Sequence, residues 1–367
     1  MVGAAVGVVV AVLLAGVLVL VLLSRSGPAR ANKVTGNLPV GANPTGVAVD
    51  SSTQTAYVTN GDGGTVSVIK NGAATSTIRV GNNPTAIAVN PSTHTAYVSS
   101  GGSTSVTQGG CVNCYSSTVG AGTVSVIDTQ TNAVTGTIGV GVNPTGVAVD
   151  ESARTLYVTN GGGDPRENST VSVIDTGTNA VTATVTVGST PAGIAVDTKT
   201  HTAYVTNNGS RTVSVVGGTR HSVAATIRVG AGPIGVAVDE STHTAYVTNE
   251  DDNAGYTGGN TVSVIDTQTN TVTDTITVGA VPLAAAVDES THTAHVTSYG
   301  GTYSRGVSAA NTAAPSVSMI DTHTNKLIGN PIAIGNGPDA VTVDVNAHTV
   351  YVTTQENGSS GTVAIIQ

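Results

Sequence analysis

The chain contains no phenylalanine and no tryptophan, and its 367 residues include only two cysteines and two methionines. Charged residues make up only 10% of the chain, and much of the remainder is valine, threonine, glycine and alanine. β-Branched side chains fit the pleated surface of a sheet, and glycine permits tight turns. The composition therefore favours an ordered protein of strands and turns over a helical or disordered one.

Basic residues are scarce beyond the N-terminal segment. After Ala31 the chain carries 11 lysines and arginines against 22 aspartates and glutamates, a net charge of −11. Such a surface repels phosphate backbones, and the set of aromatic and basic side chains that binds single strands is missing. We therefore expect no nucleic-acid partner.

The first 31 residues have a different character. Residues 2–23 form an uncharged run, long enough as a helix to cross a bilayer core of about 30 Å. Ala29-Arg30-Ala31 has the small-x-small form of a cleavage site. We expect residues 1–31 to be either a transmembrane anchor with a short tether or a signal peptide cleaved near Ala31.

The charges around this run and the composition of the body point in opposite directions. Arg25, Arg30 and Lys33 follow the run and no basic residue precedes it, so the positive-inside rule alone would leave the body in the cytoplasm. The body is nevertheless rich in threonine and poor in lysine, and its compact cysteine pair suits an oxidising compartment. We expect an extracytoplasmic protein, anchored to the membrane by an N-terminal helix or secreted after cleavage.

A phrase of the form Val-Gly-x-x-Pro recurs along the chain. It starts at Val40, Val80, Val140, Val187, Val229 and Val278, with a variant at Ile334, at spacings of 40, 60, 47, 42, 49 and 56 residues. A unit of about 40 residues is typical of a solenoid or a propeller. Each unit reads as four short strands, which in the third unit are residues 145–150, 155–160, 170–175 and 180–187.

The two ends of the chain complement each other. The seventh unit stops after its third strand, and the missing fourth phrase appears at residues 32–44, which match residues 132–144 in their Val-Thr-Gly and Val-Gly-x-Asn-Pro elements. A ring closed in this way leaves no open interface, whereas an open solenoid needs polar caps. The sequence predicts an all-β fold over residues 32–367, a seven-bladed β-propeller of four-stranded antiparallel blades whose last blade is completed by the N-terminal strand. One N-terminal hydrophobic helix is expected to precede it.

The second strand of most units carries a recognisable phrase. AYVTN begins at Ala56, Ala203 and Ala245, and LYVTN begins at Leu156. The repeat resembles the YVTN-repeat family of β-propellers, found in bacterial and archaeal extracytoplasmic and surface-layer-like proteins. The resemblance covers residues 32–367 and implies a recognition scaffold whose repeat carries no catalytic machinery. Units two, six and seven depart from the phrase, with AYVSS, AHVTS and VYVTT.

Length varies almost only between the second and third strands. Five units carry inserts there, at residues 99–122, 161–169, 250–260, 298–315 and 355–361, whereas units one and four keep four-residue turns. In an antiparallel blade these connections share one face, here called the loop face, with the links between blades. Because recognition often resides in loops on a rigid scaffold, we expect the loop face to bind the partner. The N-terminal strand starts on the opposite, plain face, so the loop face is expected to point away from the bilayer.

Several residues on the loop face are candidates for binding. Tyrosine and arginine tend to anchor interfaces, and the inserts and turns supply Tyr115, Arg166, Arg211, Tyr256, Tyr299, Tyr303 and Arg305. Asp339 is a further candidate, because it is an acid at a channel-mouth position that is threonine, alanine, isoleucine or leucine in the other units.

Two clusters have the residue types of metal or redox chemistry. Glu250, Asp251 and Asp252 offer clustered oxygens that suit Ca²⁺, but their spacing matches no recognised calcium loop and a solvated acidic turn is the simpler interpretation. Cys111 and Cys114 lack the following histidine of a haem site and the further ligands of a zinc site. We expect a short disulfide there, with a redox-active dithiol as the alternative.

Histidines gather at one position of the repeat. Five of the eight occupy the first turn of a unit, at His94, His201, His243, His292 and His348. A position repeated on the plain face of different blades is typical of turn chemistry rather than of a ligand set. His295 replaces the tyrosine of the repeated phrase within a strand, and we expect it to have a packing role.

The function expected from the sequence is therefore non-enzymatic. The chain would be a monomeric extracytoplasmic scaffold, without a cofactor, that presents loops on one face to a protein or glycan at the cell envelope. The alternative is a propeller lactonase or lyase-type enzyme with a metal at the channel mouth. Such an enzyme needs a general base close to the mouth, and no histidine is expected on that face.

Overall fold

The computed structural model describes residues 13–14, 17–18, 32–107, 115–161, 169–217, 221–250, 259–300, 313–355 and 360–367. The chain divides into two units, Met1–Asn32 and Lys33–Gln367. Within the first unit, β1 (Leu13–Leu14) pairs antiparallel with β2 (Val17–Leu18). The expected N-terminal helix is not confirmed, because the rest of its sequence lies outside the described residues. In the described part of the chain, no helix has the length and apolar character needed to cross a membrane.

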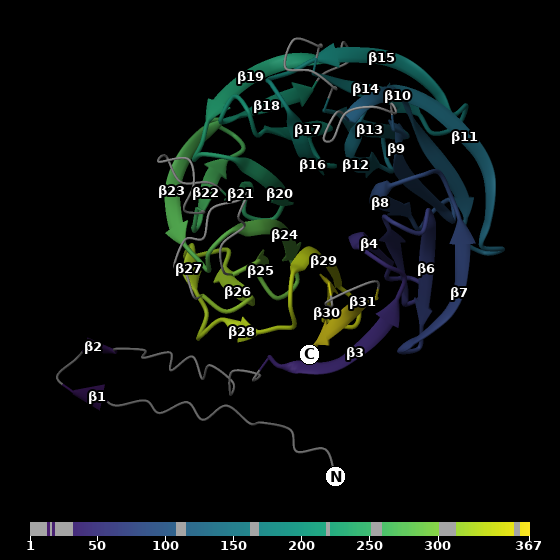
Figure 1. Ribbon diagram of the computed structural model, residues 1–367. Coiled ribbons are helices and arrows are strands. Elements are labelled where there is room, and N and C mark those ends of the chain that lie inside the picture. The colour runs from purple at the N-terminus through teal and green to yellow at the C-terminus, as the bar shows by residue number, and fades with distance from the viewer. Residues whose placement is uncertain are drawn as a thin grey trace. The chain divides into compact units, whose positions relative to one another are not determined.

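The second unit consists of seven antiparallel sheets arranged as blades around a central axis (Figure 1). Blades 1 to 7 start, in chain order, with the innermost strands β4 (Pro44–Asp50), β8 (Pro84–Asn90), β12 (Pro144–Asp150), β16 (Pro191–Asp197), β20 (Pro233–Asp239), β24 (Pro282–Asp288) and β29 (Pro338–Asp344). The second strands are β5 (Thr55–Asn60), β9 (Thr95–Thr107), β13 (Thr155–Asn160), β17 (Thr202–Asn207), β21 (Thr244–Asn249), β25 (Thr293–Ser298) and β30 (Thr349–Gln355).

The outer half of each blade follows the same order. The third strands are β6 (Thr65–Lys70), β10 (Tyr115–Asp128), β14 (Thr170–Asp175), β18 (Thr212–Gly217), β22 (Thr261–Asp266), β26 (Ser316–Asp321) and β31 (Gly361–Ile366). The outermost strands are β7 (Ala73–Arg79), β11 (Ala133–Val142), β15 (Ala180–Thr186), β19 (Ser222–Arg228), β23 (Thr271–Thr277), the pair β27 (Lys326–Leu327) and β28 (Ile332–Ala333), and β3 (Val34–Val40). The predicted seven-bladed all-β propeller is confirmed.

The ring closes because the first strand of the second unit joins the last blade. In blade 7 the strand order is β29-β30-β31-β3, so the strand from the beginning of the unit is the outermost one. At the end of this ladder the backbones of Lys33 and Gln367 exchange both hydrogen bonds, each 3.2 Å long. Leu38 of β3 packs against a core cluster that spans blades 7 and 1. The predicted completion of the last blade is confirmed.

The outermost strand of blade 6 departs from the expected four-strand pattern. It is split into β27 and β28, which pair with opposite ends of β26. Between them lie Gly329, with a φ of 63°, and Pro331. Because proline has no N–H to donate and a positive φ interrupts an extended strand, the ladder breaks at this point.

The asparagine of the repeated phrase ties the second strand of a blade to the third. Nδ2 of Asn60 donates to the hydroxyls of Thr65 and Ser67, each at 3.0 Å. The asparagines of blades 3, 4 and 5 make the same two bonds. A side chain at Gly41 would lie 2.5 Å from Cγ of Asn60, so the glycine of the Val-Gly link leaves room for this asparagine.

The threonine of the same phrase joins neighbouring blades. The hydroxyl of Thr206 in blade 4 donates to the carbonyl of Ile234 in blade 5 at 2.7 Å. The hydroxyl of Thr248 in blade 5 donates likewise to Leu283 in blade 6 at 2.9 Å. A Cβ on Gly193 would lie 2.3 Å from the Ile234 carbonyl oxygen, so this glycine allows the inner strands to approach closely.

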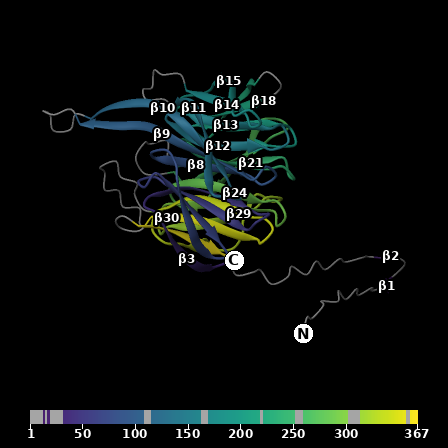
Figure 2. The ribbon, with the colours of Figure 1, turned by 90° about the vertical axis from the view of Figure 1, so that its right-hand side faces the viewer.

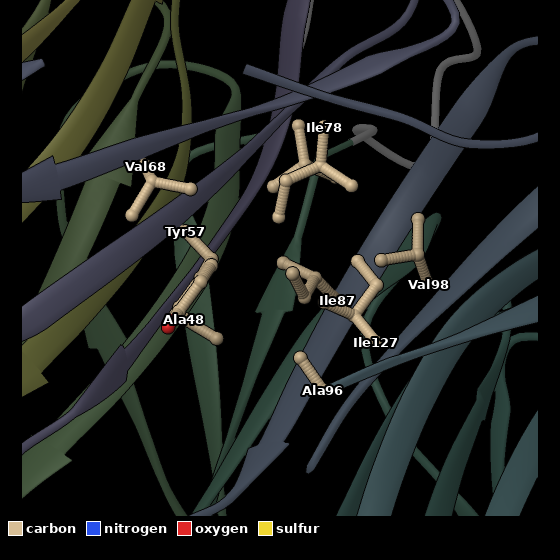
Figure 3. Packing of buried hydrophobic residues seen from close by; sticks show 9 residues of the cluster. Ala48, Tyr57, Val68, Ile78, Ile87, Ala96, Val98 and Ile127 are labelled. Atoms are coloured by element: carbon tan, nitrogen blue, oxygen red, sulfur yellow. The ribbon is translucent and has the colours of Figure 1, made fainter. Parts of the chain in front are cut away.

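The core lies between blades rather than within them. One cluster combines Tyr57 and Val68 of blade 1 with Ile87, Val98 and Ile127 of blade 2 (Figure 3). The hydroxyl of Tyr57 crosses to blade 2 and donates to the Thr129 carbonyl at 3.3 Å. Both faces of a blade are therefore apolar, as a radial stack requires.

His295 replaces this tyrosine in blade 6, and its expected packing role agrees with the structure. The side chain is buried, and its Nδ1 has no hydrogen-bond partner among the described residues. Burial lowers the pKa of His295 to about 4, so the ring is neutral near pH 7. In the neighbouring blade 7 the third strand is β31 and the fourth is β3. These two strands are not consecutive in the sequence, so blade 7 has no turn between its third and fourth strands.

Candidate functional site

The insert of blade 2 differs from the expected loop. Residues 99–122 were expected to be an insert, but β9 continues to Thr107 and β10 already begins at Tyr115. The two strands project from the ring as a ribbon (Figure 2). Serine, threonine and valine make up most of these two segments, and β-branched residues favour extended backbone. Cys111 and Cys114 lie outside the described residues.

At the loop-face end of the ring axis, here called the mouth, one position of the repeat lies beside the link to the innermost strand in every blade. This residue comes directly after the five-residue phrase of the second strand, and its N–H donates to the carbonyl of the link before the innermost strand of the same blade. In order of the blades the residues are Gly61, Gly101, Gly161, Asn208, Glu250, Tyr299 and Gln355. Blades 1 to 3 therefore present glycine at the mouth, and blades 4 to 7 present polar side chains.

We call Asn208, Glu250, Tyr299, Gln355 and Asp339 the polar crescent. Asn208 Nδ2 in blade 4 donates to Glu250 Oε1 in blade 5 at 3.0 Å. Gln355 Nε2 in blade 7 donates to Asn43 Oδ1 in blade 1 at 2.8 Å. These contacts join neighbouring blades and hold side chains of different chemistry in one arc.

The tyrosine of the crescent lies against the link of blade 7. A Cβ on Gly337 would come within 3.3 Å of the Tyr299 ring and 3.2 Å of the Gln355 Cβ. Gly337 has a φ of 58°, a conformation that glycine adopts easily. The small link residue therefore allows Tyr299 and Gln355 to approach each other at the mouth.

Asp339 is an acid of the crescent with a strongly shifted pKa. The residue is part-buried at the start of β29. Burial, with a smaller contribution from the Glu250 carboxylate, raises the pKa of Asp339 to about 7. Among the described residues, no side chain donates a hydrogen bond to this carboxyl. Asp339 is therefore poised between its charged and neutral forms near neutral pH.

The residues at the equivalent position explain why Asp339 stands apart. In blades 1 to 3 the hydroxyls of Thr45, Thr85 and Thr145 donate to carbonyls of the next blade. Blades 4 to 6 carry Ala192, Ile234 and Leu283, which cannot form such bonds. At this position of the repeat, Asp339 is thus the one ionisable residue among threonines and apolar residues.

The structure accounts for some of the predicted binding residues. Glu250, Tyr299 and Asp339 belong to the polar crescent. Arg211 lies in the four-residue turn of blade 4 with a φ of 57°, and Tyr115 opens β10 in the ribbon. The remaining candidates lie outside the described residues: Arg166, Asp251, Asp252, Tyr256, Tyr303 and Arg305.

Two members of the crescent were missed by the sequence reasoning. Asn208 and Gln355 each come directly after the five-residue phrase of the second strand, at the position of Glu250 and Tyr299. Aligning the residue after the repeated phrase across all units would have found them. The lengths of the inserts indicate longer segments as candidates and not this position.

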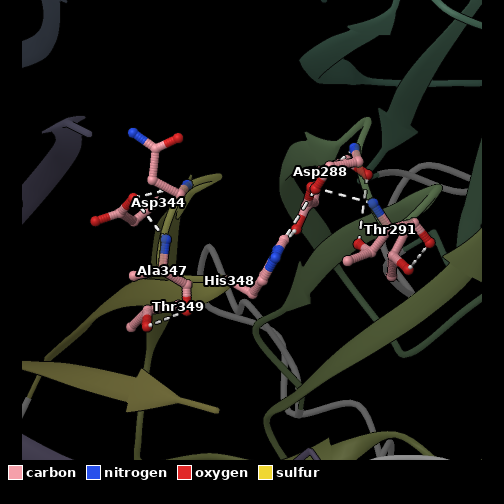
Figure 4. A network of polar contacts seen from close by, with 9 residues as sticks. Asp288, Thr291, Asp344, Ala347, His348 and Thr349 are labelled. Atoms are coloured by element: carbon pink, nitrogen blue, oxygen red, sulfur yellow. Dashed lines mark hydrogen bonds and ion pairs between the residues drawn. The ribbon is translucent and has the colours of Figure 1, made fainter. Parts of the chain in front are cut away.

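The repeated histidines lie on the plain face and support the turn interpretation. All five have φ between 48° and 55°, the left-handed region in which turns place single residues. Nδ1 of His201 lies 2.8 Å from Oδ2 of Asp150, and Nδ1 of His348 lies 3.0 Å from Oδ2 of Asp288 (Figure 4). Each pair joins neighbouring blades. In the part of the chain that the structure describes, no three histidines, cysteines or acids are grouped to hold a metal ion.

Hollows between blades also occur on the plain face. One of about 410 Å³ lies between blades 5 and 6 and is lined by turn residues that include His243, Asp266 and His323. Another of about 250 Å³ lies between blades 1 and 2 and includes His94. Both hollows are lined largely by residues of the repeated turns, so we interpret them as gaps that form where neighbouring blades pack.

Comparison with known proteins supports the fold and assigns no function. No protein-family model matches the chain, so the resemblance to the YVTN-repeat family is not confirmed. No curated protein matches it. Among solved structures, hydrazine synthase of Kuenenia stuttgartiensis is similar, with 18% sequence identity and a TM-score of 0.54 over 89% of this chain and 77% of that chain. At this identity the likeness establishes a propeller fold alone.

Proposed function

We propose that the chain is a non-enzymatic, extracytoplasmic binding protein whose loop face recognises a glycan at the cell envelope. The observation that carries this proposal is the polar crescent, where four blades place different polar side chains at a position that is glycine in the other three. A purely structural position would repeat, as the plain-face turns do. Side chains that differ while the backbone stays constant are what a specific ligand requires.

The chemistry of the crescent favours a glycan over a protein partner. Amides donate and accept, carboxylates accept, and a sugar hydroxyl does both, so Asn208, Gln355 and Glu250 match a polyhydroxyl ligand. Tyr299 adds an aromatic ring. The apolar residues of blades 4 to 6 at the position equivalent to Asp339 suit the C–H faces of a sugar. A protein partner would rely more on Tyr and Arg anchors.

The attachment of the N-terminal segment supports an outward orientation of the loop face. β3 begins at the plain face, where Lys33 pairs with the last residue of the chain. A membrane anchor before Lys33 would leave the plain face nearer the bilayer. Single cysteines at Tyr303 and at Asn270 test this on intact cells. Faster labelling at Asn270 would contradict the proposal.

The test of glycan binding compares the two faces. The full chain and the variants Asn208→Ala and Gln355→Ala are applied to an array of envelope oligosaccharides, including peptidoglycan fragments. We expect each variant to lose about tenfold in affinity, because a ligand hydroxyl loses its partner. Gln268→Ala, in an exposed turn of the plain face, should bind like the wild type.

Three outcomes of this test would count against the proposal. Absence of any glycan bound by the wild type would contradict it, as would equal binding by all variants. Retention of an envelope protein with no glycan would favour the protein alternative.

One observation favours an enzyme as a second candidate. With a pKa of about 7, Asp339 could serve as a general acid or base near neutral pH. A propeller lactonase or lyase with a metal at the mouth would use such a group. The test is a screen of lactone hydrolysis with and without added divalent cations, comparing the wild type with Asp339→Ala. Turnover that disappears in the variant would replace the binding proposal.

A further inference from the structure

The ribbon of blade 2 has two edges that the blade does not cover. We define the ribbon as residues 102–107 of β9 and 115–120 of β10, which pair from Gly102↔Gly120 to Thr107↔Tyr115. β8 pairs with β9 only as far as Ser100, and β11 pairs with β10 only from Ala121. Among the described strands, none pairs with the outer edges of the ribbon.

These edges lack the devices that normally prevent association. Residues 92–127 contain no proline and no lysine, arginine, aspartate or glutamate. Natural sheet edges are protected by charges and prolines, and other outer strands of this ring have them, as at Pro39, Arg79 and Asp274. An isolated two-stranded ribbon is also marginally stable in water. The ribbon is therefore an unprotected template for a further strand.

We propose that the free edge of β10 pairs antiparallel with the same edge of a second copy of this chain. Pairing centred on Ser117 places Tyr115 opposite Val119 and Ser116 opposite Thr118, on both sides of a twofold axis. Aromatic residues opposite β-branched ones and serine opposite threonine are favourable cross-strand pairs. The segment Tyr-Ser-Ser-Thr-Val is thus complementary to itself, as an isologous interface requires.

The other edge of the ribbon is less suited to this pairing. Residues 102–107 read Gly-Ser-Thr-Ser-Val-Thr, and no centre in that segment sets an aromatic residue opposite a β-branched one. Glycine at its start further weakens the strand. β10 is therefore the pairing edge, and β9 remains the outer strand of a four-stranded sheet made by two copies.

Charge explains why two copies would meet at the ribbon and not elsewhere. The chain after Ala31 has a net charge of −11, which opposes close approach of two rings. The ribbon carries no charged residue and projects from the ring (Figure 2), so pairing there keeps the charged bodies apart. A ladder this short predicts a weak, concentration-dependent dimer, contrary to the monomer expected from the sequence.

The test introduces charge at the centre of the proposed pairing. The full chain in a non-ionic detergent is studied by analytical ultracentrifugation over a range of concentrations. Ser117→Lys and Ser117→Glu each place like charges opposite each other, and each should weaken self-association at least about tenfold. An equimolar mixture of the two variants should form heterodimers, because the opposed charges then attract.

Two controls separate the edge from the fold. Thr104→Lys puts the same charge on β9 and should leave the dimer intact. All variants should unfold at the wild-type temperature, because the ribbon lies beyond the blade ladders. A wild type that stays monomeric at about 100 μM would overturn the proposal. So would a Ser117→Lys variant that associates like the wild type, or a mixture that fails to form heterodimers.

Discussion

The plain face and the loop face are built by the same repeat, but residue identity recurs on the plain face and differs between blades on the loop face. On the plain face, the first turn of all seven blades holds a residue with φ between 48° and 55°, and five of these residues are histidine. On the loop face, the residue after the five-residue phrase donates its backbone N–H to the link of the same blade in all seven blades. Its identity nevertheless ranges from glycine to Glu250, Tyr299 and Gln355.

This difference separates residues that build the ring from residues that are free to recognise a ligand. Recurring residues such as Thr206 and Asn207 bond across or within blades, so a change there costs stability. At Asn208, Glu250, Tyr299 and Gln355 the backbone N–H makes the structural hydrogen bond. The side chain can therefore change without loss of this bond. The comparison predicts that substitutions in the first group lower stability and substitutions in the second alter binding.

Removing the closing strand tests the framework most severely. Deletion of residues 32–40 removes β3, its whole ladder with β31 and the packing of Leu38. We expect a loss of more than about 5 kcal/mol, comparable with the full stability of many domains. Chemical denaturation measures it.

A circular permutant is the matched control for this deletion. It joins Gln367 to Lys33 through a short turn and opens the chain in the plain-face turn between Gly177 and Thr178. Every ladder is kept, so its stability should remain close to that of the wild type. A deletion variant as stable as this permutant would show that closure contributes little.

His295 makes the framework sensitive to acid. Between pH values of about 6.5 and 4 the unfolded histidine binds a proton, whereas the buried ring, with its pKa lowered to about 4, does not. The unfolded state therefore binds more protons and stability falls as the pH falls, by up to about 3 kcal/mol. His295→Tyr restores the repeat residue and should flatten this part of the profile, measured by urea unfolding at several pH values. A profile unchanged by the substitution would contradict the assignment.

Gly193 tests the close approach of the inner strands. A methyl group there would meet the Ile234 carbonyl at 2.3 Å, so Gly193→Ala should destabilise the ring by about 2 kcal/mol. Gly139→Ala is the control, because a Cβ at that position meets nothing within 4 Å. Thermal unfolding compares the two. Equal effects would mean that blade spacing is not limited by this contact.

Asp339 tests the mouth through a pH dependence of stability that has the opposite sign to that of His295. Because its pKa is raised to about 7, the folded state binds more protons than the unfolded state between pH values of about 4 and 7. Stability therefore falls as the pH rises through this window. Asp339→Asn should remove that fall, so the variant should be more stable than the wild type at pH 8. Asp274→Asn, on the exposed β23, should change little.

The sequence predicts the ring because its signals are local and repeated. The Val-Gly-x-x-Pro links and the split seventh unit define strand order and closure without knowledge of any side-chain contact. The ribbon of blade 2 was expected to be a loop. Serine, threonine and glycine occur both in loops and in strands, and only the pairing of the two segments shows that they are strands. The break in blade 6 likewise depends on how Gly329 and Pro331 sit against β26.

The candidate site was predicted only in part, because the crescent is a product of the closed ring. Gln355 and Asn43 are 312 residues apart in the sequence yet hydrogen-bonded, and Asn208 meets Glu250 only across a blade boundary. Asp339 could be recognised as an unusual acid from the repeat. Its raised pKa follows from burial and from Glu250, which only the assembled mouth brings near.

The most direct test of a one-faced recognition scaffold is hydrogen exchange of the full chain with and without an envelope polysaccharide extract. The account predicts slower exchange at the backbone amides of Asn208, Glu250, Tyr299 and Gln355, with no change in the plain-face turns at His201 and His243. Protection confined to those turns, or spread evenly over both faces, would contradict it.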